Sequence, residues 1–216
     1  MISHLSGWLV TAAAPYAQSV ALTATEVTDR LDSAEVRLSE LLALDARPGG
    51  MARADAKLRL RFAQEFLFHA IGAADVVAQI LNDRRGLSIE DPTVRKVFAR
   101  IEQGNPADPL LQSLGGLGHQ TRDRAVPSDP YTDDALLFRA MLYRHSVIHA
   151  HVHPFVFKMT LGNDAAPAYL RIDPRLGPND PPYGPNRNIS ERPASDELRA
   201  ILNLVRARTA EAVAVA

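Results

Sequence analysis

The stretch MARADAKLRLRFAQEFLFHAIGAADVVAQILN, residues 51–82, has the strongest helical periodicity in this chain. Its apolar side chains recur at three- and four-residue intervals and form two separate stripes. A helix that is apolar on two faces cannot be a surface helix, so we expect it at the centre of a bundle or between a bundle and a dimer partner. The two stripes consist of Leu58, Phe62, Phe66, Ala73, Val76 and Ile80, and of Ala63, Leu67, Ala70, Ala74, Ala78 and Leu81.

Two amphipathic helices are predicted on either side of this central helix. Residues 16–44 carry leucine and alanine at helical spacing with acidic residues between them, and the proline and glycines of residues 48–50 end the helix. A second, short helix is expected to begin at Asp91, which would cap it, with Pro92 in its first turn. Gly, Asn and Pro at residues 104–106 end this short helix.

The following part of the chain is predicted to contain a connection and a further helix. The sequence LGGLGH, residues 114–119, lacks the flanking strand and helix of a phosphate-binding loop, so we interpret it as a connection. Residues 133–151 again place apolar side chains at helical spacing, and Pro154 ends that helix.

In the last third of the chain, short apolar runs and frequent prolines replace the long helical patterns. PFVFKMTL (154–161) and APAYLRID (166–173) are apolar runs separated by Gly-Asn-Asp at 162–164, which predicts a short β-hairpin. Prolines are frequent throughout residues 154–193, which favours an extended segment wrapped over the surface. A final helix is expected over about 194–214. The predicted fold is therefore mainly α, an up-and-down helical bundle with a short β-hairpin insertion and a C-terminal helix.

Composition limits the class of protein. A chain of 216 residues with 46% hydrophobic and 23% charged residues is typical of a single globular domain, here residues 1–216. The net charge of −1 provides no global attraction for nucleic acid or anionic membrane. Because the chain has no cysteine, disulfides, thiolate metal sites and cysteine nucleophiles are excluded. The first two dozen residues lack a basic leader, so we expect a cytoplasmic protein that does not bind membranes.

The densest group of chemically versatile side chains is RHSVIHAHVH, residues 144–153. It contains four of the seven histidines of the chain, His145, His149, His151 and His153. On a helix, His145 and His149 lie one turn apart on one face, whereas Arg144 points more than a quarter-turn away from them. The long arginine side chain can still reach a common point, especially one shared with a second copy of the helix.

This motif resembles that of the HEPN superfamily, small helical bundles that are often metal-independent ribonucleases. The resemblance rests on Arg144, the polar residue His145 directly after it, and His149, all on a late helix of the bundle. The long apolar helix upstream is similar to an earlier core helix of such bundles, and the resemblance covers residues 16–153. It implies a homodimer with the motifs of both protomers in one cleft, an RNA substrate and no cofactor. Many relatives act in toxin-antitoxin or defence systems, which would add an antitoxin or inhibitor as a partner.

The residue types suit cleavage of RNA by its own 2′-hydroxyl. Histidine transfers protons near neutral pH, and arginine offers a permanently charged, planar fork to phosphate oxygens. We therefore expect Arg144 to bind the scissile phosphate, His149 to transfer the proton and His145 to orient one of them or contact RNA. Asp75, within the apolar central helix, is expected to pair with an arginine such as Arg144 or to lie at the edge of the same cleft. Arg139, which has a similar spacing to His145, is a second candidate for substrate contact.

Two other functions fit the same residues. The chain could be a non-catalytic helical dimer that acts as an interaction or RNA-binding module, since fold alone does not determine function. It could also bind a metal, because histidines four residues apart on a helix match zinc-ligand spacing and His151 or His153 would supply a third nitrogen. The absence of a carboxylate within the histidine cluster argues against the metal site.

Overall fold

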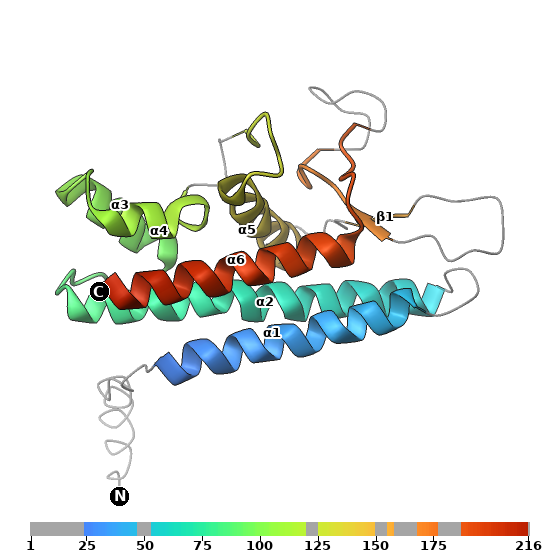
Figure 1. Cartoon of the computed structure of the whole chain (residues 1–216), viewed down its shortest axis with the longest axis horizontal. Coiled ribbons are helices and arrows are strands. Elements are labelled where there is room, and N and C mark those ends of the chain that lie inside the picture. Colours follow the sequence, from blue (N-terminus) through green and yellow to red (C-terminus); the bar gives the residue numbers. More distant parts are fainter. Residues whose placement is uncertain are drawn as a thin grey trace, which may run out of the picture.

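A computed structural model describes residues 24–46, 53–119, 125–149, 155–157, 168–176 and 187–215 of the chain. Its elements follow one another as six helices with two short strands between the fifth and the sixth helix (Figure 1). Their bounds are α1 Ala24–Asp45, α2 Arg53–Arg84, α3 Val94–Gly104, α4 Pro109–Gly118, α5 Asp133–His149, β1 Phe155–Phe157, β2 Ala168–Leu170 and α6 Ala194–Val215. The predicted mainly α fold class is therefore confirmed.

The three long helices α1, α2 and α6 lie side by side, and α3, α4 and α5 cover one side of this layer (Figure 1). The helix α1 runs opposite to α2 and α6, so the start of α1 lies near the end of α6. A single cluster of buried apolar side chains draws on all six helices and on β2. Among the described residues, no helix combines the length and the apolar character needed to cross a membrane.

The central position predicted for residues 51–82 is confirmed, because α2 contacts α1, α3, α5 and α6. The second apolar stripe, from Ala63 to Leu81, is buried within the single chain. It therefore needs no dimer partner to cover it, which removes that argument for a dimer. Among the described side chains of α2, the large apolar ones that reach the surface are isolated from one another. Phe68, which is 51% exposed, is one of them.

The start of α3 differs from its prediction. The helix begins at Val94 and is capped by Thr93, whose hydroxyl accepts a hydrogen bond from the Lys96 amide. Asp91 lies before the cap with a positive φ of 49°, a region that aspartate tolerates better than most residues. The prediction that Asp91 caps the helix was wrong, because a threonine two residues later offers the same capping chemistry.

The interpretation of residues 114–119 as a connection was also wrong, since α4 includes Leu114 to Gly118. Glycine is needed here for close packing rather than for a loop. At Gly116 a Cβ atom would lie 2.2 Å from the backbone oxygen of Asp134, and at Gly118 it would meet the ring of Phe98 at 2.3 Å. The helix is kinked at Gly115, where the backbone leaves helical geometry.

The two strands lie where the sequence places the predicted hairpin. They pair in an antiparallel register that aligns Val156 with Tyr169. The predicted turn at residues 162–164 lies outside the described residues, so the hairpin as a whole stays a prediction. Tyr169 also bridges to Pro193, directly before α6, and this contact joins the strands to the start of the last helix.

Candidate functional site

Arg144 of α5 forms an ion pair with Asp75 of α2. The Arg144 Nη1 atom donates to Asp75 Oδ2 at 2.9 Å, and the two side chains are 28% and 17% exposed. The pairing that the sequence suggested for Asp75 is present, and it links residues 69 positions apart. The contact holds the guanidinium at the surface of the bundle, and within the described part of the chain it uses one of its five N–H donors.

The same carboxylate also fixes the start of α3. The other oxygen of Asp75, Oδ1, accepts a hydrogen bond from the Val94 amide at 3.1 Å. That amide is one of the N-terminal groups that have no partner within their own helix. Asp75 therefore connects three helices, and the position of the Arg144 guanidinium is coupled to the start of α3.

Two substitutions of Asp75 are expected to separate these contacts. In Asp75→Asn the amide oxygen still accepts from Val94, whereas the charge opposite Arg144 is lost, so the free energy of unfolding should fall by about 1 kcal/mol or less. Asp75→Ala also leaves the Val94 amide without an acceptor, which should cost about 1–3 kcal/mol. Urea denaturation of both variants measures the difference, and equal losses of stability would contradict the role of Asp75 at α3.

Of the four histidines in the predicted site, the structure describes the side chain of His145 alone. His145 is exposed on α5, next to Arg144, and takes part in an interaction of its own. His149 is the last residue of α5, one turn beyond His145 on the same helix, and its side chain lies outside what the structure describes. His151 and His153 also fall outside the described residues. Arg144 and His145 are thus placed at the surface, whereas the position of the His149 imidazole stays a prediction.

Arg139 has a structural position and does not fit its predicted contact with substrate. Its side chain is fully buried and forms an ion pair with the equally buried Glu197 of α6, with 2.6 Å between Nη2 and Oε1. Its Nε and Nη1 atoms donate to the backbone oxygens of Ile172 and Pro130 at 3.1 and 3.0 Å. All three nitrogens are thus engaged by internal acceptors, and a phosphate has no access to them.

Tyr143 completes this buried centre. Its hydroxyl accepts a hydrogen bond from Arg139 Nη2 at 2.5 Å and lies 2.7 Å from the Arg171 carbonyl oxygen and 2.8 Å from Glu197 Oε1, either of which can accept its proton. Burial raises the pKa of Tyr143 well above its ordinary value, so the hydroxyl stays protonated. The second oxygen of Glu197 accepts from Ser190 Oγ at 2.5 Å.

The buried Asn188 side chain also joins two segments of the chain by hydrogen bonds. Its side-chain amide donates to the backbone oxygens of Asp173 and Leu176 at 2.9 and 3.1 Å, and its oxygen accepts from the Asp173 amide at 2.7 Å. Residues 168–176 and 187–193 are therefore fastened to α5 and α6 by buried polar side chains. This network was not predicted from the sequence, and its one visible signal is the charged Arg139 inside the apolar run of residues 135–142.

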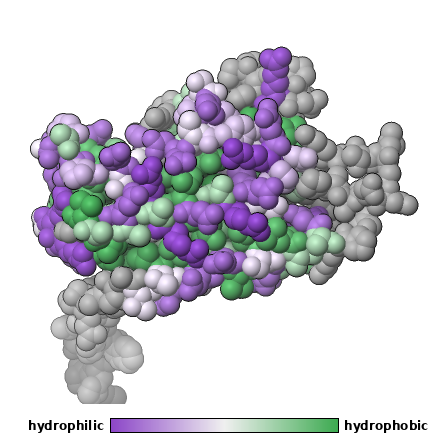
Figure 2. Space-filling view, in the orientation of Figure 1, coloured by the Kyte–Doolittle hydropathy of each residue, from purple (hydrophilic) through white to green (hydrophobic). Residues whose placement is uncertain are grey.

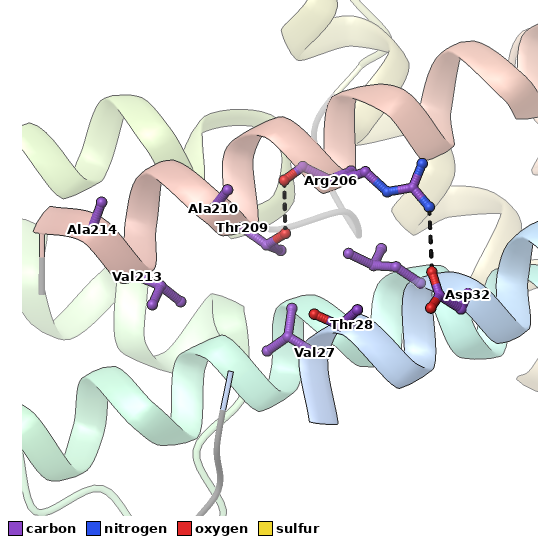
Figure 3. Close-up of a pocket in the computed structure, with 9 residues that line it drawn as sticks. Val27, Thr28, Asp32, Arg206, Thr209, Ala210, Val213 and Ala214 are labelled. Carbon is purple, nitrogen blue, oxygen red and sulfur yellow. Dashed lines mark hydrogen bonds and ion pairs between the residues drawn. The ribbon is translucent and has the colours of Figure 1, made fainter. Parts of the chain in front are cut away.

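The metal alternative stays a prediction, because the imidazoles of His149, His151 and His153 lie outside the described residues. Within the described ranges, no three histidine or acidic side chains come close enough to hold a metal ion. A groove of about 420 Å³ lies between α1 and α6, and none of the predicted site residues lines it (Figure 3). Comparison of the chain with family models, with curated proteins and with solved structures found no match.

Proposed function

We propose that this chain is a HEPN-like, metal-independent endoribonuclease that cleaves RNA at a composite dimer site. The observation that carries the proposal is the ion pair between Arg144 and Asp75. It holds the guanidinium of Arg144 at the surface of α5, next to the exposed imidazole of His145 and five residues before His149. A partly exposed cation next to a histidine supports the proposal, because a cation can stabilise charge on a phosphate and a histidine can transfer a proton.

The chemistry needs only groups of this motif and of the RNA. His149 removes the proton of a ribose 2′-hydroxyl, the 2′-oxygen attacks the adjacent phosphorus, and the bond from phosphorus to the 5′-oxygen breaks. A second histidine, His145 or a histidine of the partner helix, gives the leaving oxygen its proton. Arg144 compensates the charge that builds up on the phosphorane oxygens. The products are a 2′,3′-cyclic phosphate and a 5′-hydroxyl.

Incubation of the purified protein with single-stranded RNA in excess EDTA tests this function. We expect cleavage at the same rate with and without the chelator, because no step requires a metal ion. The fragments should carry 2′,3′-cyclic phosphate ends, and a substrate whose 2′-hydroxyls are methylated should stay intact. An Arg144→Ala variant purified in the same way controls for contaminating nuclease. Cleavage that EDTA stops and a divalent cation restores would contradict the mechanism.

A non-catalytic interaction or RNA-binding module is the second candidate. It is favoured by the same ion pair, because Asp75 already offsets the charge with which Arg144 would meet a phosphate. In that case the protein would bind single-stranded RNA without cutting it, and Arg144→Ala would change only the affinity. The assay above therefore distinguishes the two candidates, since binding without new RNA ends supports the module.

A further inference from the structure

The groove between α1 and α6 is an apolar surface without a partner among the described residues (Figure 3). It is lined by Val27 and Leu31 of α1, which are only 7% and 5% exposed, by the partly exposed Val213 and exposed alanines of α6, and by Thr28 and Thr209. Arg206 marks one end, where it lies 3.7 Å from Asp32 across the groove. Figure 2 shows apolar surface between the polar side chains of these two helices on the same face. A groove lined mainly by apolar side chains can accept a further apolar side chain from a segment that binds there.

The chain itself offers an occupant with matching chemistry. The 23 residues before α1 contain no aspartate, glutamate, lysine or arginine, although 23% of the whole chain is charged. They include LSGWLV, residues 5–10, with the only tryptophan of the chain, Trp8, between other apolar side chains. Transfer of an uncharged, aromatic-containing segment from water into an apolar groove is favourable, because it removes apolar surface from water.

The lengths also agree. The groove begins at Val27, one turn after the first residue of α1. Along α6 it extends from Arg206 to Ala214, about 12 Å at the helical rise per residue. Thirteen residues separate Val10 from Ala24, and an extended chain of that length spans up to about 40 Å. Residues 5–10 can therefore reach every part of the groove of their own chain.

We propose that residues 5–10 dock in the groove between α1 and α6 of the same chain, with the indole of Trp8 against Val27, Leu31 and Val213. This contact would cover the apolar surface and tie the segment before α1 to the last helix. It is independent of the ribonuclease proposal, because none of the residues assigned to that function lines the groove.

Tryptophan fluorescence of the full-length protein tests the docking, because Trp8 is the only source of the signal. We expect an emission maximum blue-shifted from that of a free peptide of residues 1–23, and several-fold weaker quenching by acrylamide. Ala210→Glu places a charge on the exposed groove wall and should return both values to those of the peptide. Ala207→Glu, on the same helix but outside the groove, is the matched control and should leave them unchanged.

Three results would overturn the proposal. Trp8 in the native protein could behave like the free peptide, or Ala210→Glu could leave its emission unchanged. A signal that depends on protein concentration would instead place the segment in the groove of a second copy. Far-UV circular dichroism verifies that the variants keep their helices. If Ala210→Glu loses them, Ala214→Glu, at an exposed position further along the groove, provides the same measurement.

Discussion

Arg139→Ala is expected to lower the free energy of unfolding by about 3–5 kcal/mol, the usual loss when one partner of a buried ion pair is removed. Arg139 and Glu197 are both fully buried, so water cannot replace the missing guanidinium. The substitution leaves the buried Glu197 carboxylate without its charged partner and the backbone oxygens of Ile172 and Pro130 without the arginine that donates to them. Since small domains are stable by only about 5–15 kcal/mol, a loss of this size should be evident in urea denaturation.

Arg206→Ala is the matched control for this prediction. Arg206 also joins two helices through an acidic partner, Glu35, at 2.8 Å, but the two side chains are 42% and 58% exposed. Exposed ion pairs contribute about 0–1 kcal/mol, so the control should change stability little. Glu197→Gln keeps one neutral acceptor oxygen at the same place and should fall between the two. Equal effects of Arg139→Ala and Arg206→Ala would refute a structural role for the buried centre.

The helices themselves were predictable because the spacing of their buried apolar residues is a local pattern in the sequence. The two stripes of α2 are read from spacing alone; the second is buried throughout, and the first is buried from Phe66 to Ile80, whereas Leu58 near the start of the helix is 37% exposed. The errors arose where several residues offer the same chemistry or where packing overrides propensity. Thr93 rather than Asp91 caps α3, and Gly116 lies within α4, where close packing against the backbone of α5 leaves no room for a side chain.

The candidate site was predictable only in part. The pair formed by Arg144 and Asp75 follows from the cost of an isolated charge in an apolar helix, which demands a partner. The role of Arg139 could not be inferred, because periodicity treats an arginine as exposed and its partner Glu197 lies on another helix, far along the chain. Long-range polar pairing has no sequence period, so only the fold brings such residues together.

His149→Ala is expected to slow RNA cleavage by about 10²–10⁴-fold, the contribution of one general acid-base group. His149 ends α5, away from the buried centre around Arg139, so the substitution should leave the stability of the fold intact. His145→Ala should have a smaller effect, because that side chain orients the reacting groups or contacts RNA. His153→Ala is the matched control within the same cluster, since it belongs only to the metal alternative and should leave cleavage unchanged.

The rate at which His149→Ala cleaves single-stranded RNA, measured in a single turnover with protein in excess, tests the ribonuclease proposal most directly. Excess protein saturates the RNA, so a change in rate reports the chemical step rather than binding. We expect the variant to bind RNA as the native protein does and to cleave it about 10²–10⁴-fold more slowly. A native rate of cleavage in this variant would contradict the assignment of His149 and the function built on it.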